Sequence, residues 1–237
     1  MNKKESLLDQ SLLIPFAILT AISIVFIYSS SSVVADTDFG NQYFYLQRQL
    51  IALSIGLLAG SIFLFIPISF YKENGLLLIL FSAFLLTLVF IPGIGVEKNG
   101  SLRWINIGFN IQPSEIAKIF VPIYLCGYCL RRKEQLENSW WGFIKPLILT
   151  SIISILLLLE MDLGATVVIF AIGIIILFIG GAKFNQLLLL FLVFLSTVIL
   201  IAYFNEERWS RVISFSNPWD DVGGSDYQLI NALVASV

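Results

Sequence analysis

The sequence contains no histidine among its 237 residues. Histidine is the commonest general base and metal ligand near neutral pH, so its absence removes the commonest candidate for both roles from this chain. The only two cysteines, Cys126 and Cys129, lie three residues apart in an apolar run, and two thiols cannot complete a four-ligand zinc site. We interpret them as small packing residues. Catalytic sets of the Ser/His/Asp and Cys/His kinds are excluded as well.

Charged residues are also scarce, at 13% of the chain, and the formal net charge is only −2. A balance so close to neutrality gives no indication of a nucleic-acid partner. The glycines form neither a Walker pattern nor a dinucleotide-binding pattern, and the acidic residues lack the spacing of an EF-hand calcium loop. The sequence therefore predicts no cofactor.

Apolar residues, in contrast, make up 58% of the chain, and the mean hydropathy is +0.90. Soluble domains have about 45–50% apolar and about 25% charged residues. Seven segments qualify as membrane spans, since crossing the hydrocarbon takes about 20 mostly apolar residues. The sequence thus predicts an all-α, polytopic integral membrane helical bundle, with a single transmembrane domain over residues 1–237. The expected spans are Leu12–Val33, Leu50–Phe70, Gly75–Ile91, Ile116–Leu130, Ile144–Leu159, Ala165–Gly181 and Gln186–Phe204.

Lysines and arginines in the loops predict the orientation, because cytoplasmic loops carry an excess of them. With the N-terminus inside, the inner set has eight members and the outer set five. Residues 1–11 are then cytoplasmic, and residues 205–237 begin a large outer loop. The apolar end, YQLINALVASV, predicts that the chain is the front part of a longer protein. The inner set is Lys3, Lys4, Lys72, Arg131, Arg132, Lys133, Lys145 and Lys183, and the outer set is Arg48, Lys98, Arg103, Arg208 and Arg211.

Three polar segments lie on the outer face in this topology: the loop Val96–Glu115, the turn Glu160–Gly164 and the segment after Phe204. Ionisable groups at the edge of a bilayer need a partner or water, and they usually mark a working site. Glu115 and Lys118 are spaced to meet on one helix face. This pair is either a salt bridge that fixes the helix in the membrane or the lining of a wet cavity for an anionic ligand.

The start of that helix carries conventional signals, with Pro113 near the first turn and Ser114 at the cap. Arg103, in the preceding loop, offers a planar fork suited to phosphate, or else contacts lipid headgroups without specificity. Trp104 beside it is typical of an interfacial anchor. Asp162 either caps the helix that follows it or joins Glu160 as a cavity carboxylate.

Four blocks, in order along nearly the whole chain, resemble the SEDS proteins (shape, elongation, division and sporulation), which are membrane-embedded peptidoglycan glycosyltransferases. The NPWDD sequence at residues 217–221 and the GGAK sequence at Gly180–Lys183 are more similar to the division branch than to the elongation branch. One departure is Met161, where the family often has proline. The blocks are IYSSSSVVAD at Ile27–Asp36, NGSLRWINIGFNIQPSEIAKI at Asn99–Ile119, EMDLGATVVIF at Glu160–Phe170 and RVISFSNPWDDVGGSDYQL at Arg211–Leu229.

The resemblance implies a fold of about ten membrane helices, of which this chain would hold seven. It implies a multi-pass protein of the bacterial inner membrane that polymerises lipid II into glycan strands at the division septum. The implied catalytic aspartate belongs to a motif resembling HTDFIFA beyond Val237, so no catalytic residue is assigned and the fragment is expected to be inactive. The implied partners are lipid II, membrane lipid, a class B penicillin-binding transpeptidase and other division proteins.

By motif match, the resemblance implies that Arg103, Gln112, Glu115, Lys118 and Asp162 line the outer-face cavity or hold it together. Arg103 and Lys118 would supply cations to the pyrophosphate leaving group. A divalent metal can assist there too, but the sequence shows no complete ligand set, so no metal site is assigned. Two other function classes stay open, namely a lipid II flippase and a non-catalytic scaffold that recruits division partners.

Overall fold

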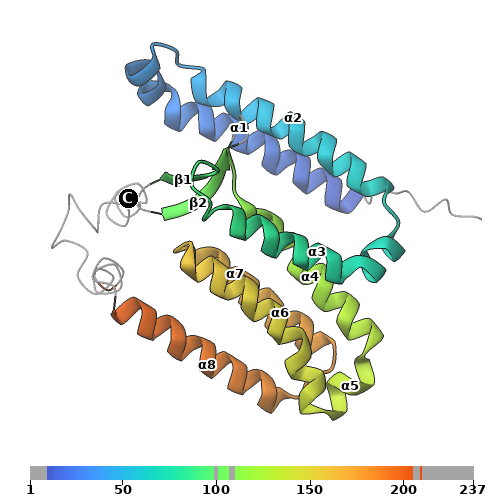
Figure 1. Cartoon of the computed structure of the whole chain (residues 1–237). Coiled ribbons are helices and arrows are strands. Elements are labelled where there is room, and N and C mark those ends of the chain that lie inside the picture. Colours follow the sequence, from blue (N-terminus) through green and yellow to red (C-terminus); the bar gives the residue numbers. More distant parts are fainter. Residues whose placement is uncertain (1–9, 99–100, 107–109, 205–208, 210–237) are drawn as a thin grey trace, which may run out of the picture. The chain divides into compact units, whose positions relative to one another are not determined.

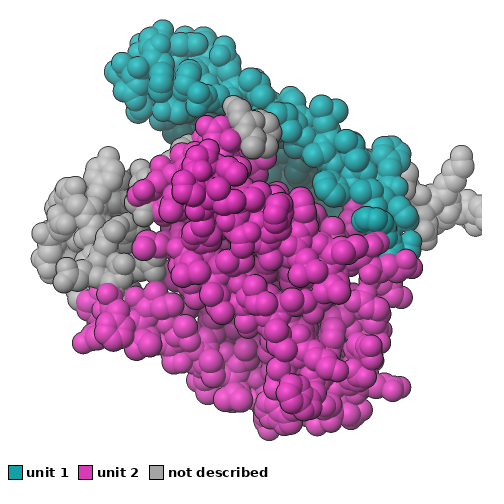
Figure 2. Space-filling view, viewed as in Figure 1, with its two compact units in different colours: residues 1–70 teal, residues 71–237 magenta. Residues whose placement is uncertain are grey.

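The computed structural model describes residues 10–98, 101–106, 110–204 and 209. The predictions that fall on residues 1–9, on Phe109 and on most of the segment after Phe204, including the NPWDD sequence, lie outside the described residues. The chain divides into two compact units, residues 1–70 and 71–237, which Figure 2 colours separately. Each unit is described by itself, and a single domain over residues 1–237 stays a prediction.

The first unit consists mainly of two long helices, α1 (Gln10–Phe39) and α2 (Phe44–Phe65), which lie side by side as a hairpin (Figure 1). Gly40 turns the chain with a φ of 64°, a left-handed value that glycine adopts without strain. The Phe39 ring then stacks on the Phe44 ring, with centroids 3.9 Å apart. The hairpin turn is thus closed by backbone geometry and by aromatic packing together.

The second unit holds the remaining helices and is built around α4, α6 and α7 (Figure 1). Its core contains Val121, Leu125, Ile153, Leu157, Ile169 and Leu177, two from each of those helices. α3 approaches α4 closely at Gly75, where an added Cβ would lie 3.2 Å from the Cα of Tyr124. Small residues allow such close contact between membrane helices. The helices are α3 (Ile68–Leu88), α4 (Pro113–Arg131), α5 (Lys133–Asn138), α6 (Trp140–Leu159), α7 (Leu163–Ile179) and α8 (Phe184–Tyr203).

The segment between α3 and α4 forms a small antiparallel sheet, although the sequence predicts only a loop there. β1 (Gly95–Lys98) pairs with β2 (Ser101–Asn106), and β2 pairs with β3 (Asn110–Ile111). Alternate residues of a strand face the same side, so Arg103 shares a face with Ile105, which is buried. Arg103 therefore lies on the buried face of the sheet, and the sheet directly precedes α4 in the chain.

A helix is present at each of the seven expected spans, which confirms the all-α bundle. Five of them, α1, α2, α3, α6 and α8, are long and apolar enough to cross a membrane. α7 is apolar but has only 17 residues, and α4 carries Glu115, Lys118 and Arg131, so seven crossings stay a prediction. The expected end of the second span at Phe70 is wrong. α2 stops at Phe65 and a new helix begins after Pro67, because the residue before a proline disfavours helix.

Candidate functional site

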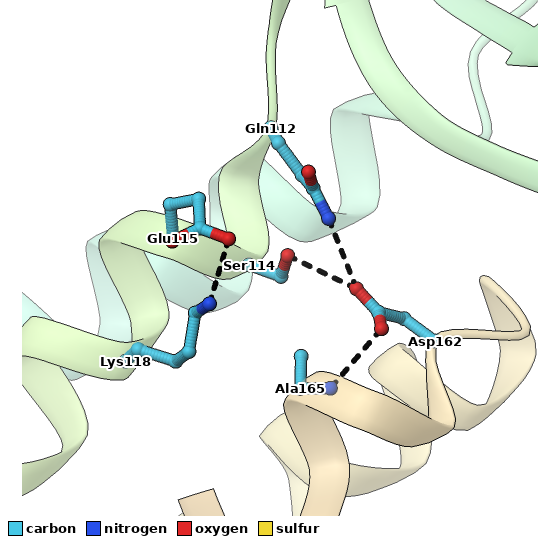
Figure 3. A network of polar contacts seen from close by, with 6 residues as sticks. All are labelled: Gln112, Ser114, Glu115, Lys118, Asp162 and Ala165. Carbon is cyan, nitrogen blue, oxygen red and sulfur yellow. Dashed lines mark hydrogen bonds and ion pairs between the residues drawn. The ribbon is translucent and has the colours of Figure 1, made fainter. Parts of the chain in front are cut away.

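Asp162 is the centre of a polar network at the end of the bundle where α4 and α7 begin (Figure 3). Its Oδ1 accepts a hydrogen bond from the Ala165 backbone N at 3.1 Å, so Asp162 caps α7, which was one of the two roles that the sequence left open. Its Oδ2 accepts two more, from Gln112 Nε2 and from Ser114 Oγ, each at 3.1 Å. One buried carboxylate therefore joins the first turns of α4 and α7.

The expectation that Ser114 caps α4 is wrong. The N-cap residue is Gln112, whose side chain makes no capping bond, and Pro113 occupies the first helical position. Ser114 lies inside the first turn and is fully buried. Its hydroxyl donates a hydrogen bond to the Asp162 carboxylate instead of capping the helix. Glu115 does lie in the first turn of α4, as expected, where a negative charge suits the helix dipole.

Glu115 and Lys118 form the ion pair that their spacing predicted, with Lys118 Nζ 2.6 Å from Glu115 Oε1. Figure 3 shows the two side chains turned toward each other, whereas Gln112 and Ser114 point toward Asp162. The Lys118 side chain is 27% exposed and that of Glu115 is 61% exposed. An ammonium carries three N–H donors, so Lys118 can bind an anion without giving up Glu115.

Arg103 reaches from β2 to the turn between α6 and α7. Its Nη2 donates to the carbonyl oxygen of Met161 at 2.6 Å, across a sequence separation of 58 residues. Its Nε is buried and has no hydrogen-bond partner in the described part of the chain. Arg103 therefore holds the backbone directly beside Asp162, through a contact to a carbonyl that its sequence position does not suggest.

Met161 adopts a φ of 60°, a left-handed conformation that is uncommon outside glycine and asparagine. Two backbone bonds close the turn as a Schellman motif, from Asp162 N to Leu157 O at 2.8 Å and from Met161 N to Leu158 O at 3.1 Å. The conformation costs about 1–2 kcal/mol for a residue with a Cβ. Proline is fixed near a φ of about −65°, so it could not occupy this position in the turn seen here.

Glu160 is completely buried at the C-cap of α6, and both of its carboxylate oxygens lack hydrogen-bond partners among the described residues. Burial raises the pKa of Glu160 to about 8, and the negative charge of Asp162 adds to this rise, while Arg103 opposes it. With that pKa, Glu160 is mostly protonated at pH 7. The sequence paired it with Asp162, but it was not predicted as a site residue. Glu160 directly follows four leucines at the end of an apolar run, and this position in the sequence was the available indication that its side chain is buried.

The structure brings the predicted residues together in two groups. Gln112 and Asp162 are bonded directly, and Arg103 binds the backbone beside them. Glu115 and Lys118 form a separate pair on α4. The described ranges contain no group of three His, Cys, Asp or Glu residues that could hold a metal ion. The expectation of an assisting divalent metal therefore stays untested.

A family model described as "cell cycle protein", named for FtsW, RodA and SpoVE, matches residues 9–236. A probable peptidoglycan glycosyltransferase FtsW of Pseudomonas fluorescens is 42% identical over 229 residues, which cover 96% of this chain and 56% of that relative. A protein of the same name from Buchnera aphidicola of Acyrthosiphon pisum is 39% identical over 92% of the chain and 54% of its own length. The chain therefore spans about half the length of the curated relatives that it matches.

Two solved structures have a similar fold. A chain from a study of how a peptidoglycan synthase complex coordinates polymerization and crosslinking matches with a TM-score of 0.73 and 27% identity, over 96% of this chain and 64% of that one. The rod shape determining protein RodA of Thermus thermophilus matches with a TM-score of 0.57 and 28% identity, over 73% of this chain and 58% of RodA. The polar blocks of the sequence and the helical fold thus lead to the same group of proteins.

Proposed function

The chain belongs to the FtsW, RodA and SpoVE family of cell cycle proteins, and we propose that the whole protein is a peptidoglycan glycosyltransferase that polymerises lipid II at the division septum. The observation that carries this proposal is the polar network where α4 and α7 begin. In it, one buried carboxylate joins two helix starts while a half-buried lysine stays accessible next to them. A bundle that only had to fold would gain little from so many ionisable groups at one end.

Lys118 is proposed as the cation that meets the pyrophosphate of the lipid substrate. Its exposure leaves room for a ligand, and the ion pair with Glu115 positions the ammonium one turn into α4. A cation placed where negative charge develops on a leaving group stabilises the transition state. Glu115 would thus position Lys118 rather than contact the sugar.

Asp162, Gln112 and Arg103 are proposed to hold the site together. The Asp162 carboxylate accepts three hydrogen bonds from the starts of α4 and α7. Arg103 is partly engaged by the Met161 carbonyl, and its remaining N–H groups can bind a phosphate oxygen at the edge of the site. The general base is expected in a part of the protein that follows Val237, so the chain alone is proposed to be inactive.

The cellular setting is proposed from the relatives. The helices fit a multi-pass membrane protein, and the inner bacterial membrane is proposed with the N-terminus in the cytoplasm. A class B penicillin-binding transpeptidase is the proposed partner, supported by the likeness to a peptidoglycan synthase complex. Other division proteins would place the pair at the septum.

The proposal is tested by purifying the complete protein with its partner transpeptidase and supplying labelled lipid II. We expect glycan strands from the wild type, no product from Lys118→Ala, and full activity from Lys183→Ala, which removes a lysine at the opposite end of the bundle. If the wild type forms no strands while a control polymerase does, the proposal is wrong.

The same substrate separates the two other function classes. A flippase would carry labelled lipid II across vesicles and leave it chemically unchanged, whereas a polymerase consumes it. A non-catalytic scaffold would support growth of a depleted strain with Lys118→Ala at normal membrane levels. We expect Lys118→Ala to fail in that complementation, because the enzyme needs the ammonium.

A further inference from the structure

A second polar feature lies at the other end of α4, where the chain passes from α4 into α5. A cleft of about 320 Å³ there is lined by Leu130, Arg131, Arg132, Lys133, Glu134 and Gln135. Three consecutive cations stand in its wall, and Glu134 is the only carboxylate among these lining residues. This cleft belongs to the second unit and is far along α4 from the Asp162 network, so the proposed function does not use it.

The backbone that carries these cations is held firmly by its surroundings. Leu136 of α5 is fully buried in the core. α5 packs so closely on α6 that a Cβ on Gly142 would come within 2.0 Å of the Gln135 carbonyl oxygen. Tyr128 Oη donates to the Gly142 carbonyl at 2.7 Å, and Arg132 N donates to the Tyr128 carbonyl at 2.9 Å. These contacts therefore hold the backbone of the cleft wall in place, and with it the Cα positions from which the cationic side chains extend.

The three cations differ in how far they are already engaged. Arg131 Nη1 donates to the Lys72 carbonyl, so it belongs to the joint between α3 and α4. Lys133 Nζ lies 3.7 Å from Glu137 Oε1, and both side chains are exposed, so this pair is loose. The Arg132 side chain is exposed and takes part in no ion pair within the described residues. Arg132 and Lys133 are thus available to an external anion.

Exposed apolar and aromatic side chains flank this basic run in the chain, with Leu130 before it and two tryptophans after it. Trp140 and Trp141 begin α6 and are 54% and 69% exposed. They directly precede Gly142, the residue that contacts Gln135 in the cleft wall. Leu130, also in the wall, is exposed. Exposed tryptophans at a helix end are typical of the membrane interface, where lipid headgroups lie.

From this arrangement we infer that the cleft binds the headgroup of an anionic phospholipid. Arg132 and Lys133 hold the phosphate, and the acyl chains lie beside Leu130 and the two tryptophans. A guanidinium fork binds two phosphate oxygens at once, which an isolated surface lysine cannot do. Basic residues directly beside a membrane helix are suited to acidic headgroups, whereas a zwitterionic lipid brings its own cation into the cleft.

The test uses the full chain, purified in an uncharged detergent and titrated with phosphatidylglycerol or phosphatidylcholine, with bound lipid counted by native mass spectrometry. We expect phosphatidylglycerol to bind and phosphatidylcholine to bind far more weakly. Arg132→Gln combined with Lys133→Gln should raise the half-saturating concentration of phosphatidylglycerol by roughly 25-fold, at about fivefold per charge. Arg132→Lys, which keeps the charge, should have a smaller effect. The matched control is Lys145→Gln, which removes an exposed cation of α6 outside the cleft and should bind like the wild type.

Four results would overturn the inference. They are equal binding of the two lipids, unchanged binding by the double glutamine variant, an equal loss in Lys145→Gln, and full displacement of the lipid by inorganic phosphate at matched concentration. The third would indicate diffuse surface charge, and the fourth a site for the free anion. Circular dichroism of each variant shows that the helices are intact, so that a loss of binding is not a loss of fold.

Discussion

The two turns at the ends of α7 have the same backbone design and different chemistry. Both are Schellman motifs: Asp162 N bonds to Leu157 O in the first, and Ala182 N bonds to Leu177 O at 3.0 Å in the second. The second turn uses Gly181, with a φ of 99°, at its left-handed position. The first uses Met161 there, and it is surrounded by ionisable side chains.

The two turns reach the same backbone conformation by different means. The glycine turn needs no help from side chains to reach its conformation. The methionine turn is held by Arg103 on the Met161 carbonyl and by the bonds of Gln112 and Ser114 to Asp162. Strained backbone persists where the surroundings over-determine it, and such places concentrate at functional sites. The turn at 160–162 fits that pattern, and four variants sharpen the contrast.

The largest effect is expected from Glu160, through pH. Because its pKa is raised in the folded state, to about 8, the folded protein holds a proton that the unfolded chain has lost above about pH 4.5. This contribution to stability is complete below that pH and is lost as the pH rises toward 8. The unfolding free energy of the wild type relative to Glu160→Gln should therefore fall by up to about 1.4 kcal/mol per pH unit in that window. Unfolding in mixed micelles at several pH values measures it, and a difference that is independent of pH would refute the assignment.

Asp162→Ala should be the next most damaging change. It removes the cap of α7 and leaves Gln112 and Ser114 without their acceptor. We expect the free energy of unfolding to fall by about 3 kcal/mol, with about 1 kcal/mol from the lost cap and about 1 kcal/mol from each donor left without an acceptor. Asp162→Asn, which keeps the size and one acceptor oxygen, should lose less than half of that. Thermal unfolding in detergent ranks the two, and equal losses would mean that the network does not hold the turn.

Gly181→Ala is expected to destabilise the glycine turn by about 1–2 kcal/mol, because a Cβ strains the left-handed backbone. The new methyl group would also lie 2.8 Å from Glu137 Oε1, so that side chain has to move. The same thermal unfolding assay measures the loss. Gly164→Ala is a suitable control, since its added Cβ meets nothing closer than 3.7 Å.

Met161→Gly should produce the smallest effect and one of opposite sign. It relieves about 1–2 kcal/mol of backbone strain, and it gives back about 0.5–1 kcal/mol through the greater freedom of glycine in the unfolded chain. The Met161 side chain is half exposed, so little packing is lost. We expect a small rise in melting temperature. A loss as large as that of Gly181→Ala would show that the two turns are not equivalent in backbone design.

The sequence predicted the features of the site that are local in the chain. The Glu115–Lys118 pair follows from a spacing of three residues on a helix, and the Asp162 cap from its position before an apolar run. The helices were also predictable, because hydropathy marks the interior of a span. The ends of the helices were harder to predict, because composition changes little between a helix terminus and its interior, as at Phe65 and Pro67.

The contacts that build the site could not be predicted, because they join residues far apart in the chain. Ser114 and Gln112 meet Asp162 across 48 and 50 residues, and Arg103 meets Met161 across 58. Nothing in a single sequence states these pairings. The sheet was missed because its strands have only two to six residues and mix aromatic, polar and charged side chains. The burial of Glu160 depends on the same tertiary packing.

The affinity of the complete protein for lipid II tests the central claim most directly, since the network around Asp162 is proposed to present Lys118 to a pyrophosphate. Binding is measured with labelled lipid II for the wild type, for Lys118→Ala and for the control Lys183→Ala. We expect the affinity of Lys118→Ala to fall by about tenfold or more, as for the loss of one charge-assisted bond, and the control to match the wild type. Equal affinities in all three proteins would contradict the account.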